Sequence, residues 1–270
     1  MNRRLLRFLS VAVVLAATSA SHAGNVVWNN TIGGNWSATG NWNPHRVPTS
    51  TDVAIITNNG NYTVTVDIDA DVGGLILGYT NATAQVLSAN GKVFSLSGAA
   101  TINPSGRFNL TASSFNSDTN GSGATISGTL NASSAVLSGR MTLATNGIMT
   151  FSNTGSSFNS LALTNNGTVN WYQANLTNTG TSIVVNEGVW DAKTNNSLFS
   201  SSGTIAFNNH GTLRKSGGFL TDSNGTSFGS GVVFSNTGSL DILSGKLTAQ
   251  NVNVSGTFNI NSNAALELYG

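Results

Sequence analysis

The sequence contains no cysteine, 3 prolines in 270 residues, and 8% charged residues. Without cysteine there can be no disulfide framework and no thiolate ligands for a metal, so a disulfide-stabilised small domain is excluded. The charged fraction is far below the roughly 25% of typical soluble domains. This scarcity disfavours a nucleic-acid-binding protein with a basic stripe.

The polarity comes instead from neutral residues, since the chain has 37 Asn and 31 Gly together with many Ser and Thr. These residues suit turns and are poor helix formers, so a helical bundle or coiled coil is disfavoured. Hydrophobic residues make up 39% of the chain, and the formal net charge is +1. Simple disorder requires fewer apolar residues and more net charge, so the composition predicts an ordered all-β protein.

Residues 1–23 have the pattern of a secretory signal. Its basic start, apolar centre and small-residue cleavage site are Arg3, Arg4 and Arg7, then Val11 to Ala17, then Ser21-His22-Ala23 before Gly24. The apolar stretch is too short to span a membrane as a helix. Removing the signal leaves eight basic against ten acidic residues, a net charge of −2. We therefore expect a secreted or cell-surface bacterial protein with no transmembrane segment in the mature chain and no nucleic-acid partner.

A repeat of about 21 residues runs through the rest of the chain. Its turns contain a glycine at the recurring positions Gly106, Gly128, Gly147, Gly167, Gly188, Gly211, Gly238 and Gly256. Apolar residues stand two positions after every anchor: Phe108, Leu130, Met149, Val169, Trp190, Leu213, Leu240 and Phe258. They also stand four positions before every anchor: Ile102, Ala124, Leu143, Leu163, Val184, Phe207, Phe234 and Val252. Four positions after the anchors, Lys215 is the single break in another apolar series.

A period near 20 residues with short alternating strands is typical of a solenoid, in which each repeat buries its apolar face against the next. We therefore predict a single-stranded, right-handed parallel β-helix. The Asn-x-Gly turns would supply a residue that tolerates positive φ at the bend between faces, and Asn residues in register would form side-chain amide ladders. The 27-residue gap from Gly211 to Gly238 predicts a loop at 216–225. A β-sandwich is the alternative, although its strands are usually spaced by 8–12 residues.

Residues 24–78 differ from the repeats at 79–270. Three of the five tryptophans, Trp28, Trp36 and Trp42, fall in this segment together with two of the three prolines. A solenoid needs a cover over its end coil, because an open end exposes apolar surface and unpaired strand groups. We expect this aromatic-rich segment to form an N-terminal cap and the first coils.

This segment resembles the start of bacterial autotransporter-like and adhesin-like β-helix passengers. The resemblance rests on the series Trp28, Gly34-Asn35-Trp36, Asn41-Trp42, Val47-Pro48, Asp52-Val-Ala-Ile-Ile56, Thr63-Val-Thr-Val-Asp67 and Val72-Gly-Gly-Leu-Ile-Leu-Gly78. The segments around Phe207-Asn-Asn-His-Gly-Thr-Leu213 and Asn236-Thr-Gly-Ser-Leu240 are similar to repeats of large bacterial surface proteins. The resemblance implies an architecture and a surface role, and it implies no reaction. No membrane barrel follows Leu266-Glu-Leu-Tyr-Gly270, so we expect a partial chain.

Asp67, Asp69 and Asp71 alternate, so on one strand they would share a face. Calcium binding is one interpretation, because hard cations take several carboxylate oxygens. A solvated strand face is the favoured one.

Parallel β-helices also support polysaccharide lyases and glycosidases, whose chemistry needs paired carboxylates or carboxylates beside Arg or Lys. The candidate residues for such chemistry are Glu187, Asp191, Arg214, Lys215, Asp222 and Asp241. They are sparse, and we expect Arg214-Lys215 to be a solvated turn pair. A polysaccharide-degrading enzyme is therefore kept as the alternative function.

The remaining candidates point to no cofactor, metal or catalytic site. His210 lies in a turn and should be exposed, His45 lies in the cap, and His22 belongs to the signal. Trp171 and Trp190 occupy inward positions and should be core residues. No regular Thr-x-Thr series recurs at the anchors to continue Thr63-Val-Thr65, and no phosphate-binding loop is present. The favoured function is a rigid adhesion or structural module that presents neutral polar faces to glycans, matrix or other cells.

Overall fold

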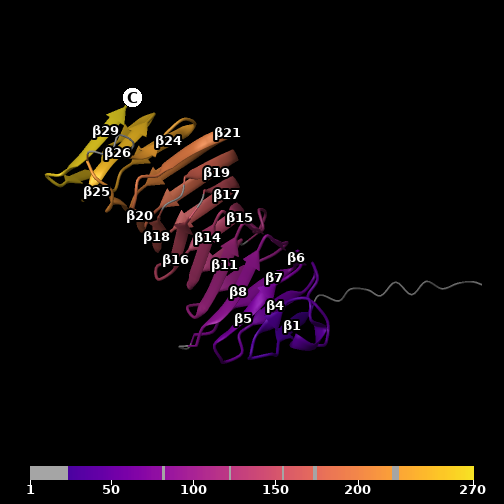
Figure 1. Cartoon of the computed structure of the whole chain (residues 1–270). Helices are drawn as coiled ribbons and strands as arrows, with labels where there is room; N and C mark the ends of the chain where they lie inside the picture. Colours follow the sequence, from indigo (N-terminus) through magenta and orange to yellow (C-terminus); the bar gives the residue numbers. More distant parts are fainter. Residues whose placement is uncertain (1–23, 81–82, 122, 154, 173–174, 221–224) are drawn as a thin grey trace, which may run out of the picture.

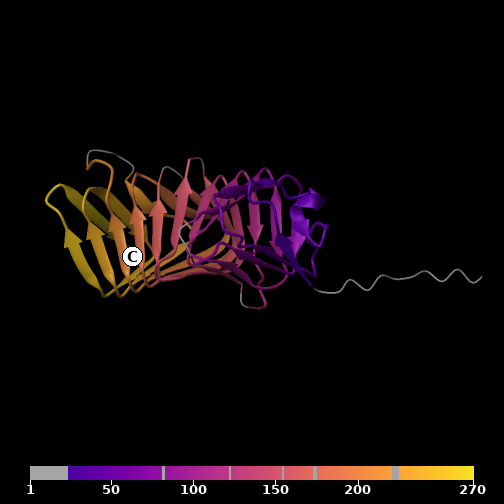
Figure 2. The same ribbon diagram turned by 90° about the horizontal axis from the view of Figure 1, so that it is seen from below.

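The computed structural model describes residues 24–270 except 81–82, 122, 154, 173–174 and 221–224, so the predicted signal at 1–23 lies outside the described residues. The chain winds into a parallel β-solenoid of about nine turns, with coils of about 22 residues. Successive coils stack from the indigo end to the yellow end (Figure 1), and Figure 2 shows the same stack from below. The all-β parallel β-helix prediction is confirmed. In the described part of the chain, no helix has the length and apolarity needed to cross a bilayer.

The coils carry their strands in three stacks, here called the first, second and third faces in the order in which most coils visit them. The first face is a continuous sheet of parallel strands. Its members are β2 (Gly34–Asn35), β5 (Tyr62–Val66), β8 (Gln85–Asn90), β11 (Gly106–Thr111), β14 (Thr129–Ser133), β16 (Ile148–Ser152), β18 (Thr168–Trp171), β20 (Val189–Ala192), β22 (Thr212–Lys215), β25 (Ser239–Ile242) and β28 (Thr257–Ile260).

The second and third faces merge in the middle of the molecule, because four long strands run across both of them. The long strands are β15 (Val136–Leu143), β17 (Ser156–Asn165), β19 (Leu176–Asn186) and β21 (Ser197–Asn209). The second face also holds β6 (Ala70–Val72), β9 (Val93–Leu96), β12 (Ser114–Asn116), β23 (Thr226–Phe228), β26 (Gly245–Gln250) and β29 (Ala264–Tyr269). The third face also holds β1 (Asn25–Trp28), β4 (Val53–Ile56), β7 (Gly74–Leu77), β10 (Ala100–Ile102), β13 (Ala124–Ile126), β24 (Val232–Asn236) and β27 (Val252–Val254). The long strands bend at residues with positive φ, such as Gly139, Gly180 and Gly203.

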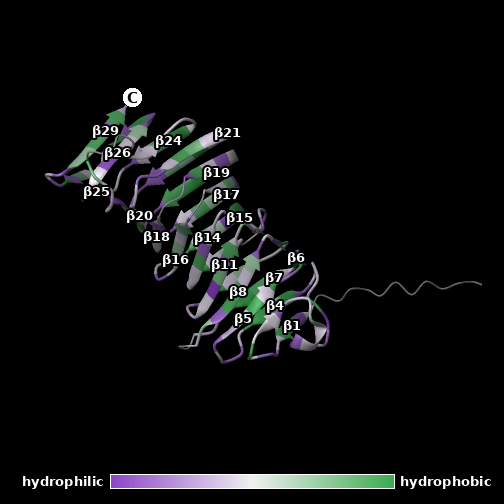
Figure 3. Cartoon of the chain, viewed as in Figure 1, coloured by the Kyte–Doolittle hydropathy of each residue, from purple (hydrophilic) through white to green (hydrophobic). Residues whose placement is uncertain are grey.

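The apolar positions two residues after the anchor glycines form one inward column. Phe108, Leu130, Met149, Val169, Trp190, Leu213, Leu240 and Phe258 are direct register partners from strand to strand. All of them except Phe258 are fully buried. In Figure 3 the strands carry both hydrophobic and hydrophilic residues, as expected when alternate side chains point into the solenoid and out of it.

The column predicted four residues before the anchors is partly wrong. Ile102 pairs with Ile126, and Leu143 pairs with Asn165. Ile102 and Leu143 therefore belong to the neighbouring inward column. In the predicted column their places are taken by Ala100 and Met141, which pair with Ala124 from the coils on either side. The turns before Gly106 and Gly147 differ in length from that before Gly128, so counting backwards from the glycine does not preserve the register.

The anchor glycines serve close approach between coils. The prediction of a positive-φ residue in the Asn-x-Gly turns is wrong, since neither the eight glycines nor the asparagines of turns such as Asn209-His-Gly211 adopt one. A Cβ atom added to Gly188 would lie 2.2 Å from the carbonyl oxygen of Gly167, and one added to Gly211 would lie 2.3 Å from that of Gly188. The same contact recurs from Gly211 to Gly238 and from Gly238 to Gly256. Any side chain here would collide with the backbone of the coil below.

The predicted amide ladder exists at the corner between the third and first faces. Asn165, Asn186, Asn209 and Asn236 are fully buried and in register. Each of the first three donates from Nδ2 to Oδ1 of the next, over 2.6, 2.6 and 2.5 Å. Each also donates to a backbone carbonyl of the next coil, as Asn209 does to Ser239 at 3.0 Å. The ladder thereby gives buried polar groups partners within the core.

The aromatic-rich segment packs at the N-terminal end. Trp28, Trp36 and Trp42 are fully buried, and the ring of Trp42 meets the other two edge-on, with centroids 4.9 and 4.8 Å apart. β3 (Trp42–Asn43) follows the short 3₁₀ helix η1 (Thr39–Asn41) and pairs antiparallel with β1. This strand covers part of the β1 edge, which would otherwise carry unpaired backbone groups.

An ion pair secures the same segment. The buried carboxylate of Asp52 accepts hydrogen bonds from the guanidinium of Arg46, from the Thr49 hydroxyl at 2.7 Å and from the Thr49 amide at 2.9 Å. The hydrogen bond from Arg46, supported by those from Thr49, holds the pKa of Asp52 well below its ordinary value despite burial.

We predict that Gly188→Ala destabilises the solenoid by about 1–3 kcal/mol, the usual cost of overpacking. The added Cβ would meet backbone atoms, and these cannot move without displacing a strand. Urea unfolding followed by circular dichroism measures the change. Gly40→Ala is the matched control, because a Cβ at that position meets nothing within 4 Å. Equal unfolding midpoints for the two variants would contradict the close-approach explanation.

Replacing one member of the ladder should leave its neighbours unsatisfied. Asn209→Ala removes the acceptor of Asn186 and the donor to Asn236 and to the Ser239 carbonyl. We expect a loss of about 1–3 kcal/mol of unfolding free energy, the cost of buried polar groups without partners. Hydrogen exchange should also quicken at the amides of the adjoining turns. The control is Asn170→Ala on β18, which removes a half-buried amide in the outward series of the first face. A similar loss in both variants would show that the ladder contributes nothing.

Candidate functional site

Three of the charged candidates come together on the outer side of the first face. Asp191 on β20, Arg214 on β22 and Asp241 on β25 are direct register partners, so they stack in one outward column. Adjacent parallel strands lie about 4.8 Å apart, so the backbone positions of the two aspartates are separated by roughly 10 Å, with that of Arg214 between them. The column lies on the face of a sheet.

The carboxylate of Asp191 is engaged by its own surroundings. It is nearly buried, and it accepts a hydrogen bond from Lys193 at 2.8 Å and another from the Ser216 hydroxyl at 2.6 Å. The Lys193 ammonium also lies 5.8 Å from the centre of the Tyr172 ring. Asp191 therefore ties the ends of β20 and β22 together.

Asp241 is held as a carboxylate. Its Oδ1 accepts hydrogen bonds from the Ser239 hydroxyl at 2.6 Å and the Asn259 amide at 2.8 Å, and Arg214 lies 4.0 Å from Oδ2. Partial burial tends to raise the pKa of Asp241, but the hydrogen bonds from Ser239 and Asn259, aided by Arg214, outweigh it and lower the pKa. Because a general acid needs a raised pKa, Asp241 is poorly suited to protonate a glycosidic oxygen.

Lys215 corrects the expectation of a solvated Arg214-Lys215 pair. Both residues lie in β22, where successive side chains alternate, so Arg214 points outward and Lys215 inward. Lys215 is fully buried and occupies the apolar column four residues after the anchors. Its ammonium donates to the carbonyls of Thr194, at 3.1 Å, and Gly217. Its stem fills the core while its charge reaches carbonyls at the corner.

The other charged candidates lie apart from this column. Glu187 and His210 pair across the corner at 2.8 Å, with both side chains 44% exposed, which confirms the predicted exposure of His210. His45 is exposed in the cap segment. Asp222 lies outside the described residues, as does part of the loop predicted at 216–225.

The three alternating aspartates do not share one strand. Asp67 and Asp69 lie in the corner between β5 and β6, and Asp71 lies in β6. Asp67 accepts hydrogen bonds from the hydroxyl and amide of Ser37, which together outweigh partial burial and lower its pKa. Asp69 accepts one from the amide of Val93 at 2.9 Å. No group of three or more His, Asp or Glu side chains in the described ranges could hold a metal ion.

Neutral polar side chains form further outward stacks. Asn131 donates to Asn109 at 2.8 Å on the first face. On the third face, Thr101, Thr125, Thr142 and Thr164 follow one another in register. Sequence reasoning missed this threonine stack, because it was sought at a fixed distance from the anchor glycines and as a Thr-x-Thr pattern. Trp171 and Trp190 are fully buried, as predicted.

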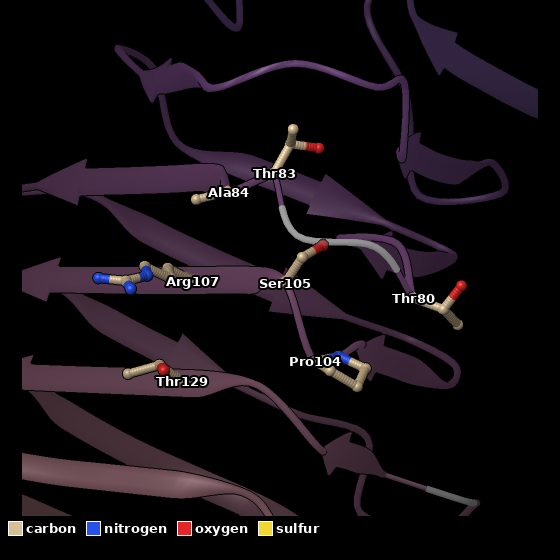
Figure 4. A pocket seen from close by; sticks show the side chains of 7 residues that line it. All are labelled: Thr80, Thr83, Ala84, Pro104, Ser105, Arg107 and Thr129. Atoms are coloured by element: carbon tan, nitrogen blue, oxygen red, sulfur yellow. The ribbon is translucent and has the colours of Figure 1, made fainter.

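A hollow of about 460 Å³ lies beside the corner that precedes β8 and β11. Its lining is Thr80, Thr83, Ala84, Pro104, Ser105, Arg107 and Thr129, shown in Figure 4. Arg107 and Thr129 lie side by side on adjacent strands, and Thr80 and Thr83 come from the preceding corner. The sequence gives no signal for this hollow, because its residues belong to three coils and follow no motif.

No protein-family model matches the chain, and neither the curated proteins nor the solved structures contain a match to it. The geometry alone therefore defines the class: a parallel β-solenoid with neutral outer stacks, a mixed-charge column and a hydroxyl-lined hollow among its described residues.

We predict that the carboxyl group of Asp241 titrates below the ordinary aspartate value of about 3.9. Since its folded pKa is lowered, ionised Asp241 stabilises the fold above the unfolded pKa, and this stabilisation disappears as the pH falls through the folded pKa. Asn259→Ala removes one hydrogen bond and should raise the midpoint, as measured by carbon-detected NMR titration. Asn261→Ala, which removes a side-chain donor to a backbone carbonyl, is the control. A midpoint above the ordinary value would favour the enzyme alternative.

Proposed function

We propose that this chain is a secreted or cell-surface bacterial module with a structural and adhesive role, of the kind implied by its resemblance to autotransporter-like and adhesin-like passengers. The observation that supports this most is the combination of a continuous solenoid core with outer stacks of neutral polar side chains. Because each coil contacts the next over three faces, the solenoid can hold its outward side chains at fixed spacings over its length.

The proposed mechanism of adhesion is geometric. Outward Asn, Ser and Thr side chains recur at about 4.8 Å from coil to coil, as in the Asn109–Asn131 and Ser138–Asn116 hydrogen bonds of 2.8 Å. Such a surface offers donors and acceptors to the hydroxyls of a glycan or to a second polar surface. Each hydrogen bond contributes only about 0.5–1.5 kcal/mol, so affinity depends on many contacts made together.

The polysaccharide-degrading alternative has less support. Its best carboxylates, Asp191 and Asp241, are both engaged in hydrogen bonds, and the pKa of Asp241 is lowered. Glycosidases instead separate the pKa values of two carboxyl groups, so that one keeps its proton near neutral pH. Arg214, which lies 4.0 Å from Asp241, favours the ionised form of that carboxyl group.

Beads coated with the exported protein should bind a subset of glycans on an array or adhere to bacterial cells, and soluble protein should compete. Asp191→Asn and Asp241→Asn should leave this binding within about twofold of the wild type, because neutral stacks supply most of the contacts. None of the three proteins should release sugar fragments. Failure to bind any glycan, matrix or cell would contradict the adhesive role. Fragment release that is lost in either variant would support the enzyme alternative.

A further inference from the structure

Arg107 is an isolated positive charge on the first face, whose other outward basic residue has an acidic partner. Arg214 lies near Asp241, and at the adjoining corner Lys193 contacts Asp191. The register partners of Arg107 are Val86 on β8 and Thr129 on β14, both uncharged. Its exposed guanidinium makes no hydrogen bond or ion pair with any other described residue. Five N–H donors are therefore directed to solvent at the edge of the hollow.

The floor of the hollow is fixed by a hydrogen-bond network. Gln85 is fully buried, and its amide donates to the carbonyl of Gly60 at 2.8 Å and to the Thr83 hydroxyl at 3.2 Å. The Ser105 hydroxyl lies 2.7 Å from Oε1 of Gln85, and it accepts a hydrogen bond from the Tyr79 amide at 2.7 Å. These contacts hold the corners of adjacent coils together, so the site needs little ordering when a ligand enters.

Some polar side chains of the hollow are not used by the protein itself and can bind a ligand. Ser105 and Thr83 are already hydrogen-bonded, whereas the hydroxyls of Thr80 and Thr129 make no hydrogen bond within the described part of the chain. Pro104 and Ala84 add small apolar surfaces beside them. The hollow thus offers a guanidinium for an anion, two hydroxyls for polar groups, and apolar surface for the face of a ring.

We propose that this hollow binds an acidic saccharide, with the carboxylate of one sugar acid on Arg107, a ring hydroxyl of the same unit on the neighbouring Thr129, and a following unit reaching Thr80 beyond Ser105 (Figure 4). Guanidinium pairs with carboxylate in a two-point geometry that also fixes orientation. A volume of about 460 Å³ is many times that of an inorganic anion and lies in the range of small-ligand sites. No second basic residue lines the hollow, which makes a polyphosphate or nucleic acid a poor match.

The inference rests on the proposed adhesive function and names one ligand class for it. Isothermal titration of the full, exported protein with trigalacturonate should give a measurable affinity. The neutral methyl ester of trigalacturonate should bind at least about tenfold more weakly, since it lacks the charge. Arg107→Gln should weaken trigalacturonate binding by about tenfold or more. The affinity of Arg107→Lys for trigalacturonate should lie between those of the wild type and Arg107→Gln, because lysine keeps the charge and loses the two-point geometry.

Arg140→Gln is the matched control. Arg140 lies on β15, is exposed, has no ion pair with a described residue and does not line the hollow, so its loss changes the net charge equally. Circular dichroism of each variant checks the fold. Equal binding by Arg107→Gln and Arg140→Gln, or equal binding of the acid and its ester, would overturn the proposed site. Binding of neutral glycans by the wild-type protein without measurable binding of trigalacturonate would overturn the site and keep the adhesive function. Trigalacturonate binding by a protein that adheres to no cell or matrix would keep the site and remove that function.

Discussion

The close stacking of coils at the corner between the third and first faces constrains the rest of the structure. There, successive anchor glycines lie so near the carbonyl oxygen of the previous coil that a methyl group has no room, as at Gly188 above Gly167. The first-face strand that follows each glycine is then held in register with the first-face strand of the previous coil. The inward columns, the outward stacks and the amide ladder are all consequences of this register.

The same register allows polar groups inside the core. An isolated asparagine in an apolar interior would cost free energy, because its amide would lack partners. When four asparagines occupy one column, each of the first three amides donates to the asparagine of the next coil, as Asn186 does to Asn209. Coils outside the ladder place Ile102, Ile126 and Val254 at equivalent positions, so this corner accommodates either apolar side chains or hydrogen-bonded asparagines. The abundance of asparagine in the chain is therefore partly a property of its core.

Much of this architecture could be predicted from the sequence, because a repeated apolar position implies a stacked column. The column that includes Trp190 and Leu213 was correct residue by residue, since it lies a fixed two positions after the glycine. The column before the glycine failed at Ile102 and Leu143, where the turn changes length. Lys215 was misplaced because charge alone suggested solvent, whereas strand alternation directs it inward. The hollow at Arg107 is lined by residues of three adjacent coils, an arrangement that no single repeat encodes.

In-register stacking also explains why the chain has so few charges. An outward position is followed about 4.8 Å away by the same position of the next coil, so repeated charges of one sign would repel along the whole solenoid. Neutral side chains avoid this cost and can hydrogen-bond to their own kind, as Asn109 and Asn131 do. Where charges do stack, the signs alternate, as in Asp191, Arg214 and Asp241. Arg107 departs from this arrangement, since neutral residues flank it on both sides and its charge contributes nothing to cohesion between coils. A charge without a structural partner, beside a preformed hollow, is best explained by a ligand that carries the opposite sign.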